Sequence, residues 1–340
     1  MKQLNTVRWG IIGAGNVTEK KSGPPLYKIN HSQLVAVMRR NQEKAADYAR
    51  RHSVPKWYSD AAALINDPEV DVVYVATPPD THAHYAIEAM RAGKPVYVEK
   101  PMARTYADCL EMIDVSEETG MPLWVAYYRR TLPAFLKVKE LIEEGIIGMP
   151  LLVNIKLHKA KPERLQKPEE MNWHVFPEIS GGGHFFDLGS HQFDYLDFLF
   201  GPVKKVSGIA SNRAGLYPAE DIVVGTWEHE SGITGSGSWC FVGDNSSDTD
   251  EIIITGEKGV ITLPCFSHEN ITVETPSGKE EMAFDNPEHI SQYLIQQVVD
   301  ELRGKGKCIS TGHSAARTSR VLEEMVKNYY NQNKLTEPPA

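Results

Sequence analysis

Short apolar runs alternate with helical patterns over the first 125 or so residues. Asn41, Asp80 and Thr105 stand where helices can be capped. Gly93 and Gly120 stand where two of these helices can end. Apolar runs of about five residues are typical of strands covered on both faces, as in parallel sheets. The alternation predicts an α/β fold with a right-handed, doubly wound parallel sheet. The runs are VRWGIIG, LVAVM, VDVVYVA, PVYVE and PLWVA.

The pattern changes after Tyr127. One helix that ends at Gly145 is followed by a strand and then by a helix over about 183–200. Strand-like runs with the hairpin turns HESG and GEKG come next. Two more helices follow, at about 289–303 and 313–330. This order predicts an α+β domain built on an open, mostly antiparallel sheet. The runs of this part are PLLVNIKLH, KKVSGIAS, DIVVGTWEHE, ITGSGSWCFV, EIIITG, GVITLP and ITVET.

Length and charge refine this picture. A chain of 340 residues exceeds the size at which one hydrophobic core usually stops growing. We therefore expect two domains, 1–126 and 127–340. The chain has 36 Lys and Arg against 45 Asp and Glu, which gives a net charge of −9. Such a balance argues against a nucleic-acid or anionic-membrane partner, so any bound phosphate requires a local basic site.

Cysteine usage and the N-terminus bear on the compartment. The four cysteines form no CxxC pair and are too sparse for a disulfide framework. The start, MKQLNTVRWG, lacks the apolar stretch of a signal peptide, and no run of 18 apolar residues could span a bilayer. We expect a cytoplasmic protein.

A glycine-containing turn follows the first apolar run. Gly13 would make the tight turn of a dinucleotide fold, and Gly15 would let a pyrophosphate approach the backbone. Asn16 and Val17 would open the following helix and contact the cofactor. The third small position of this motif is Thr18. GxG also occurs in ordinary strand-to-helix loops, but its place after the first strand favours a dinucleotide site.

Two further motifs, ATPPDTH and VEKPM, stand at the ends of the runs VDVVYVA and PVYVE. Open α/β sheets bind ligands at such strand ends. Thr77, Pro78 and His82 are the cofactor contacts expected from the first motif. In the second, Lys100 could polarise a substrate oxygen and Glu99 could reach ribose hydroxyls. The alternative is an ordinary surface Glu–Lys pair.

The second domain contains GGGHFFDLGSH at residues 181–191. Asp187 and His191 are four apart, so on an α-helix they would be neighbours on one face. A carboxylate beside an imidazole suits a general acid or base. His191 could instead be a core histidine, or it could ligate a metal together with His184 and Asp187. Because no obvious further ligand accompanies them, we expect no metal.

These motifs together resemble those of a known family. GIIGAGNV, ATPPDTH, VEKPMA, YYRR and GGGHFFDLGSH, in this order and spacing, resemble the glucose–fructose oxidoreductase/inositol dehydrogenase family (Gfo/Idh/MocA type) of NAD(P)-dependent oxidoreductases. The resemblance runs from Val7 to about Tyr330. It implies a Rossmann domain, a second domain on an open antiparallel sheet, and a substrate held between the two.

The resemblance also implies roles for particular residues. Lys100, Asp187 and His191 fall on the family's catalytic positions. Members mostly oxidise or reduce sugars, polyols and related cyclic compounds. Weaker candidates for substrate contact follow the run PLWVA or precede the glycines: Arg129, Arg130, Trp173 and His174. For each of these, a solvated arginine or a packing side chain is an equal alternative.

Arg39 and Arg40 follow the second apolar run, where NAD-preferring relatives tend to have an acid. This position faces the adenosine ribose in a dinucleotide fold. A guanidinium pairs with a 2′-phosphate through charge-assisted hydrogen bonds. Although both could be solvated helix-entry residues, we expect NADP to be preferred over NAD.

The expected function is hydride transfer between nicotinamide and a sugar, polyol or related cyclic alcohol or ketone. A redox-neutral, NAD-dependent cleavage of a glycosidic bond is one alternative, and a non-catalytic NADP-sensing protein is another. The presence of Lys100, Asp187 and His191 together argues against the last. Because few helices remain to cover the second sheet, we expect a homodimer or homotetramer through that sheet.

Overall fold

A computed structural model describes residues 3–161, 171–267 and 270–336. The chain divides into two compact units, Met1–Leu132 with Asn286–Ala316, and Pro133–Asp285 with Arg317–Ala340. This division differs from a single boundary after residue 126, because a late helix, α10 (Gln292–Leu302), returns to the first unit. Its apolar side chains, such as Leu294 and Val298, are completely buried in that unit's core.

The first unit contains a six-stranded parallel sheet in the order β3-β2-β1-β4-β5-β6. This order confirms the predicted doubly wound Rossmann sheet, in which the chain changes direction between β1 and β4. Every residue of β4 and β5 is buried, as the continuous apolar runs predicted. The strands are β1 (Val7–Ile12), β2 (Ser32–Met38), β3 (Lys56–Tyr58), β4 (Val72–Val75), β5 (Val96–Val98) and β6 (Leu123–Val125).

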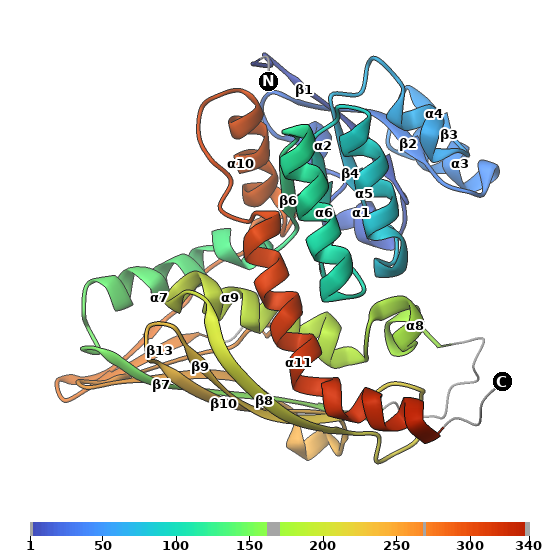
Figure 1. The fold of residues 1–340 in the computed structure, drawn as a ribbon. Helices are drawn as coiled ribbons and strands as arrows, with labels where there is room; N and C mark the ends of the chain where they lie inside the picture. Colours follow the sequence, from blue (N-terminus) through green and yellow to red (C-terminus); the bar gives the residue numbers. More distant parts are fainter. Residues whose placement is uncertain (1–2, 162–170, 268–269, 337–340) are drawn as a thin grey trace. The chain divides into compact units, whose positions relative to one another are not determined.

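Helices cover both faces of this sheet (Figure 1). One core lies between the sheet and α4, α5 and α6, and the other lies between the sheet and α2, α3 and α10. The helices of this unit before α10 are α1 (Asn16–Lys20), α2 (Pro25–Lys28), α3 (Gln42–Arg51), α4 (Ala61–Ile65), α5 (His82–Arg91) and α6 (Tyr106–Thr119).

Most of the predicted helix ends are confirmed. Asn41 accepts a hydrogen bond from the Lys44 amide at 2.9 Å, and Thr105 accepts one from the Asp108 amide at 3.1 Å. The cap predicted at Asp80 is wrong, because α5 begins only at His82, after a 3₁₀ turn over Pro79–Thr81. The consecutive prolines of ATPPDTH fix that turn ahead of the helix.

The second unit contains an eight-stranded sheet in the order β14-β13-β12-β11-β7-β10-β9-β8. Among the described strands of this sheet, only β7 and β10 pair in parallel, so the prediction of a mostly antiparallel sheet is confirmed. Strand β14 was not predicted, because GKEEM has no apolar alternation. The strands are β7 (Pro150–Ala160), β8 (Val203–Ser211), β9 (Ile222–His229), β10 (Thr234–Gly243), β11 (Thr249–Gly256), β12 (Val260–Leu263), β13 (Ile271–Thr275) and β14 (Gly278–Met282).

One face of this sheet packs against helix α9 (Ser190–Phe200). Phe193 of α9 meets Trp227 of β9 edge to face, with ring centroids 5.0 Å apart. The helix predicted over about 183–200 is divided in two, because a π-helix over Phe185–Gly189 precedes α9. The other helices of this unit are α7 (Pro133–Glu143), α8 (Pro177–Ser180) and most of α11 (Gly312–Thr336).

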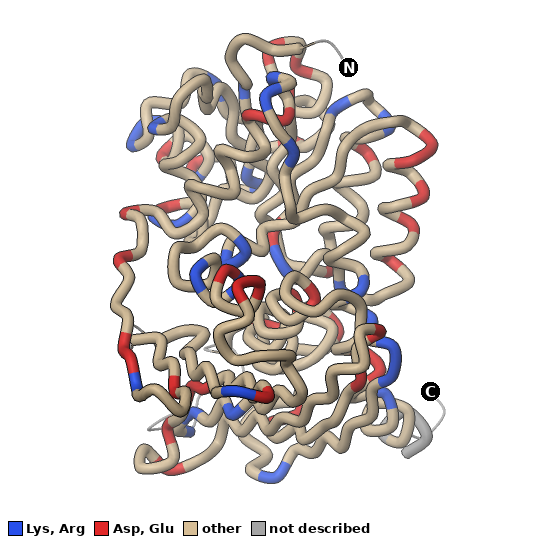
Figure 2. Tube along the Cα trace, turned by 90° about the vertical axis from the view of Figure 1, so that its left-hand side faces the viewer, with Lys and Arg blue, Asp and Glu red and all other residues tan. Residues whose placement is uncertain are grey.

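Charge is dispersed along the part of the chain that the structure describes. Lys and Arg positions are interspersed with Asp and Glu positions along the trace (Figure 2). Among the described helices, none is both long and apolar enough to cross a membrane.

Candidate functional site

The glycine turn lies directly after β1, at the centre of the parallel sheet. Gly13 has a φ of 89°, and a Cβ there would lie 2.6 Å from Cγ2 of Thr77. A Cβ on Gly15 would meet only the carbonyl oxygen of Gly13, at 3.5 Å. Gly13 therefore packs against the next strand end, while Gly15 leaves open space above the backbone.

Thr18, at the third small position of the motif, is completely buried. Its hydroxyl accepts a hydrogen bond from the Gly15 amide at 3.0 Å and donates one to the Gly15 carbonyl at 2.8 Å. A separate close approach of the backbone occurs at Gly23. A Cβ on Gly23 would lie 1.9 Å from the Thr18 carbonyl oxygen, which also accepts the Tyr48 hydroxyl at 2.8 Å.

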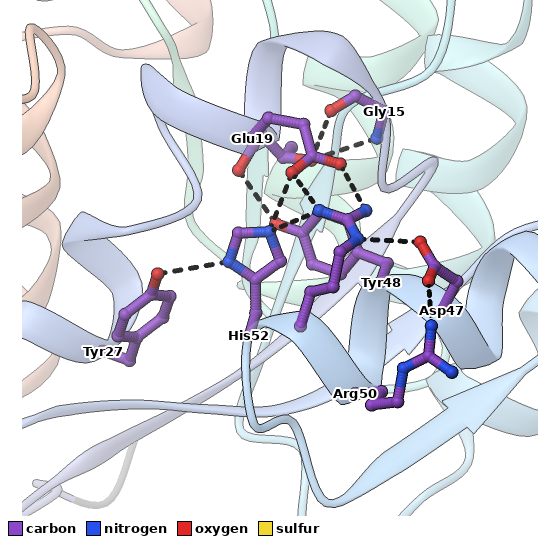
Figure 3. A network of polar contacts seen from close by, with 9 residues as sticks. Gly15, Glu19, Tyr27, Asp47, Tyr48, Arg50 and His52 are labelled. Carbon is purple, nitrogen blue, oxygen red and sulfur yellow. Dashed lines mark hydrogen bonds and ion pairs between the residues drawn. The ribbon is translucent and has the colours of Figure 1, made fainter.

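A polar network fixes α1 to its neighbours (Figure 3). The Glu19 carboxylate accepts two hydrogen bonds from Arg51, and Nε2 of His52 lies 2.8 Å from the same carboxylate. The other ring nitrogen of His52 lies 3.2 Å from the Tyr27 hydroxyl. The hydrogen bonds from Arg51 lower the pKa of Glu19 to about 2. Sequence reasoning missed this network, because its members come from three different helices or helix ends.

Arg39 and Arg40 follow β2, as predicted. The Arg39 amide donates to the Tyr58 carbonyl at 3.1 Å, and the Arg40 side chain is exposed. Burial raises the pKa of Asp80, whereas the positive charges of Arg104 and Arg40 lower it. The charged surface at these strand ends therefore also includes Asp80 and Arg104, which sequence reasoning did not include.

His82 is completely buried at the start of α5. Its Nε2 lies 2.7 Å from the Thr77 carbonyl oxygen, and its Nδ1 lies 3.0 Å from the Pro101 carbonyl oxygen. Burial lowers the pKa of His82 to about 4, whereas the hydrogen bonds to these backbone carbonyls act in the opposite direction. The side chain thus lies between the segments that follow β4 and β5. Pro78 also lies in the segment after β4, directly before the 3₁₀ turn over Pro79–Thr81.

Glu99 and Lys100 follow β5. The Glu99 side chain is not a surface group: the residue is only 8% exposed, and its carboxylate accepts hydrogen bonds from the Tyr74 hydroxyl and, at 3.2 Å, from the Lys100 amide. Burial raises the pKa of Glu99. The Tyr74 hydroxyl also lies 2.7 Å from Oγ of Ser22, beyond the end of α1. This chain of contacts links the backbone of Lys100 to the segment after the glycine turn.

Arg129 and Arg130 occupy a 3₁₀ turn after β6, and both are buried rather than solvated. Arg129 donates to the Tyr128 hydroxyl at 3.2 Å. Arg130 donates to the carbonyl of Ile309 at 3.2 Å. Arg130 therefore ties β6 to the segment before α11 within the first unit.

In the second unit, Asp187 lies in the π-helix. Such helices are rare and occur frequently at functional sites. One carboxylate oxygen of Asp187 lies 3.9 Å from Nε2 of His174, whose ring stacks on Trp173 with centroids 3.7 Å apart. The structure thus brings together three of the predicted residues, including a His174–Asp187 pair that sequence reasoning did not foresee.

His191 lies in the first turn of α9 and is only 3% exposed. Its ring meets the edge of Phe266 at 5.9 Å. Within residues 3–161, 171–267 and 270–336, no group of three or more His, Cys, Asp or Glu side chains is arranged to hold a metal. His184, Asp187 and His191 do not form such a group.

The glycines of GGGHFFDLGSH permit close approach within the protein itself. A Cβ on Gly182 would lie 2.2 Å from the Phe186 ring, and one on Gly183 would lie 2.6 Å from the Glu220 carbonyl oxygen. The three glycines predicted a close approach to the backbone, but the sequence could not identify the Phe186 ring and the Glu220 carbonyl as the groups that approach it.

Known proteins share this arrangement. Residues 7–127 match the family described as "Oxidoreductase family, NAD-binding Rossmann fold", and residues 135–262 match the "GFO/IDH/MocA C-terminal domain". Oxidoreductase P35 of Formosa agariphila is 39% identical over 93% of this chain and 97% of its own length. A 1,5-anhydro-D-fructose reductase of Ensifer adhaerens is 27% identical over 90% of this chain and 91% of its own.

A solved structure shows the same fold. An oxidoreductase from Desulfitobacterium hafniense superposes with a TM-score of 0.86 over 96% of both chains, at 22% identity. Both domains are matched in chain order, and the P35 relative spans nearly the whole chain. The chain therefore belongs to the GFO/IDH/MocA family of oxidoreductases, with an NAD(P)-binding Rossmann domain and the family's C-terminal domain.

Proposed function

We propose that this oxidoreductase is a dehydrogenase or reductase that transfers a hydride between NADP(H) and a CH–OH or C=O group of a sugar, polyol or related cyclic compound. The observation that carries the proposal is the position of Lys100. It lies just after β5 of the Rossmann sheet, next to Glu99, and its backbone amide donates to the buried Glu99 carboxylate. The substrate class is supported by the relative named for reduction of 1,5-anhydro-D-fructose.

The first unit fits a dinucleotide. The space above Gly15 would be filled by a side chain at that position, and the turn is held by Thr18 and by the Glu19–Arg51 contact. Arg39 and Arg40 supply positive charge at the end of β2, where the adenosine ribose lies in this fold. Both features support binding of NADP(H), and the arginines favour NADP over NAD.

The proposed chemistry divides among three side chains. When bound, the nicotinamide donates or accepts the hydride. The Lys100 ammonium donates a hydrogen bond to the substrate oxygen and stabilises the negative charge that develops on it. His191 gives or removes the proton of that oxygen, and Asp187 orients the substrate or the imidazole. Lys100 belongs to the first unit, whereas Asp187 and His191 belong to the second.

Four further side chains are proposed to contact the substrate. Trp173 and His174 form a stacked pair beside Asp187, and such a flat surface suits a sugar ring. Arg129 and Arg130 lie in the turn after β6, at the edge where open α/β sheets bind ligands, and their guanidinium groups would donate hydrogen bonds to the substrate.

The test is turnover with NADPH and a panel of keto-sugars and inosose-like ketones. Lys100→Met and His191→Ala should each lower kcat by at least ~100-fold while NADPH binding, measured by fluorescence titration, survives. Net NADPH oxidation excludes the redox-neutral cleavage of a glycoside. A His191→Ala enzyme with near-normal kcat would remove the proton-transfer role from that residue.

We also propose that the protein forms a homodimer or homotetramer through the face of the second sheet opposite α9. Ile209 of β8 and Val224 of β9 are paired neighbours on that face and are 77% and 50% exposed. Exposed apolar residues that lie side by side are typical of an interface. Light scattering at micromolar concentration should give a dimer or tetramer, and Ile209→Glu should lower the mass. A monomeric wild type would exclude this assembly.

A further inference from the structure

Glu220 is a buried carboxylate that has no part in the proposed chemistry. It precedes β9 and is completely buried. One carboxylate oxygen accepts the Gly183 amide at 2.8 Å, and the other accepts the hydroxyl of Tyr330 from α11. Burying a carboxylate is costly unless hydrogen bonds compensate for the lost water. Both of these hydrogen bonds come from outside the sheet. One of them comes from the triple-glycine segment, residues 181–183, which leads to Asp187.

The segment around Glu220 also packs against the triple-glycine segment and the following His184 at three points. The Tyr217 ring meets the His184 ring edge to face, with centroids 5.5 Å apart. A Cβ on Gly183 would lie 2.9 Å from Cβ of Ala219 and 2.6 Å from the Glu220 carbonyl oxygen. The triple-glycine segment therefore packs directly against Ala219 and Glu220, and the Glu220 carboxylate accepts the Gly183 amide.

The triple-glycine segment leads into the π-helix over Phe185–Gly189. The Phe186 amide donates to the Gly183 carbonyl at 3.0 Å, so the first bend of the chain before Asp187 is built on Gly183. A shift of Gly183 would be passed on to the side chains that follow it. From these contacts we propose that Glu220 is a positioning residue that fixes the triple-glycine segment and thereby sets the position of Asp187. The inference rests on the proposed function in so far as Asp187 takes part in turnover.

The electrostatic environment of Glu220 shows that its burial is costly. Burial is the main cause that raises the pKa of Glu220, and the charge of Asp221 acts in the same direction. The hydrogen bonds from Tyr330 and Gly183 lower it, and the net pKa is about 7. An apolar residue of similar size would avoid this penalty if the segment served only to fill the core.

The test compares Glu220→Gln with Glu220→Leu. The glutamine keeps an acceptor for the Gly183 amide, whereas leucine leaves that amide unpaired. We expect Glu220→Leu to lower kcat about 10-fold or more, because small misplacements of catalytic groups are costly, and Glu220→Gln to recover most of the loss. The Kd of NADPH should stay within about 3-fold of the wild-type value, because the proposed cofactor residues lie in the first unit. Glu230→Gln, at an exposed acid just after β9, is the control and should leave kcat unchanged.

Two measurements keep the inference separate from the proposed function. In an Asp187→Asn background, Glu220→Leu should lower kcat little further, because it acts through Asp187. An equal loss in both backgrounds would contradict the positioning role, whereas a fully active Asp187→Asn enzyme would contradict the proposed function. Amide hydrogen exchange needs no substrate: it should become faster over residues 181–189 in Glu220→Leu but not in Glu220→Gln. Unchanged exchange there would overturn the inference.

Discussion

Arg51 donates two hydrogen bonds to the carboxylate of Glu19, at 2.7 and 2.8 Å. This paired contact joins α3 to α1, the short helix that follows the glycine turn (Figure 3). Paired Arg–carboxylate contacts are geometrically specific as well as strong. A helix of five residues has little stability of its own, so the contact contributes to holding the proposed pyrophosphate-binding turn in place.

Replacing Glu19 should therefore weaken both folding and cofactor binding. The pKa of Glu19 is lowered from 4.5 to about 2, so its stabilisation is complete above about pH 4.5 and is lost as the pH falls toward 2. Allowing for partial solvent exposure, we expect Glu19→Gln to cost about 1–2 kcal/mol of unfolding free energy near neutral pH. Urea unfolding from neutral pH to about pH 3 measures this. Glu118→Gln, an exposed acid on α6, is the control, and an identical loss in both variants would refute the assignment.

Gly23 should not tolerate a side chain. A Cβ there would lie 1.9 Å from the Thr18 carbonyl oxygen and 2.7 Å from the Tyr48 hydroxyl, so the backbone around Thr18 would have to move. We expect Gly23→Ala to destabilise the protein by about 2 kcal/mol or more, and to weaken NADPH binding at least several-fold. Gly306→Ala is the matched control, because nothing lies within 4 Å of a Cβ at that position. Equal melting temperatures for the two variants would count against the packing argument.

His82 should make the protein sensitive to mild acid. Its pKa is lowered from 6.5 to about 4 by burial, so the unfolded chain binds the proton more tightly than the folded chain. The stabilisation is complete above about pH 6.5 and is lost as the pH falls to about 4, a change of about 3 kcal/mol. Denaturant unfolding between about pH 7 and pH 4 should show a shallower pH dependence in His82→Gln than in the wild type.

The control for His82 lies on the same helix. The side chain of His84 is 64% exposed beside Glu88, and His84→Gln should leave the pH dependence of stability unchanged. If His82→Gln and the wild type lost stability in parallel, another group would have to account for the acid sensitivity.

The first unit could be predicted largely from the sequence, because its signals are local. The caps at Asn41 and Thr105 act within three residues, and a buried parallel strand is a continuous apolar run. Because ligands bind at the carboxyl ends of such strands, the motifs around Gly13 and Lys100 could be assigned to one edge of the sheet. Their cofactor and catalytic roles remain proposals.

The second unit resisted prediction where distant segments meet. Asp187 and His191 were paired by the spacing of an α-helix, but a π-helix over Phe185–Gly189 changes that spacing, and His174 lies close to Asp187. Glu220 meets Gly183 and Tyr330 across 37 and 110 residues of sequence, respectively. No periodicity in the sequence reports such contacts.

The preference for NADP depends on Arg39 and Arg40, at the end of β2. An acid at this place accepts a hydrogen bond from the ribose 2′-hydroxyl and repels a 2′-phosphate, whereas an arginine attracts the phosphate. Each charged hydrogen bond to phosphate contributes about 1.5–3 kcal/mol, so losing both arginines should weaken NADPH binding about 100-fold or more and leave NADH nearly unaffected.

The experiment is a pair of fluorescence titrations, with NADPH and with NADH, on the wild type and on Arg39→Asp/Arg40→Ala. The control is Arg91→Ala, since Arg91 is an exposed arginine at the opposite end of α5 from His82. Because Arg91→Ala removes a positive charge elsewhere in the first unit, it reports any general effect of net charge on a polyanionic ligand. The wild type should bind NADPH more tightly than NADH, the double variant should reverse or abolish that order, and Arg91→Ala should keep it. Equal wild-type affinities, or a double variant that still prefers NADPH, would exclude the two arginines as the source of cofactor preference.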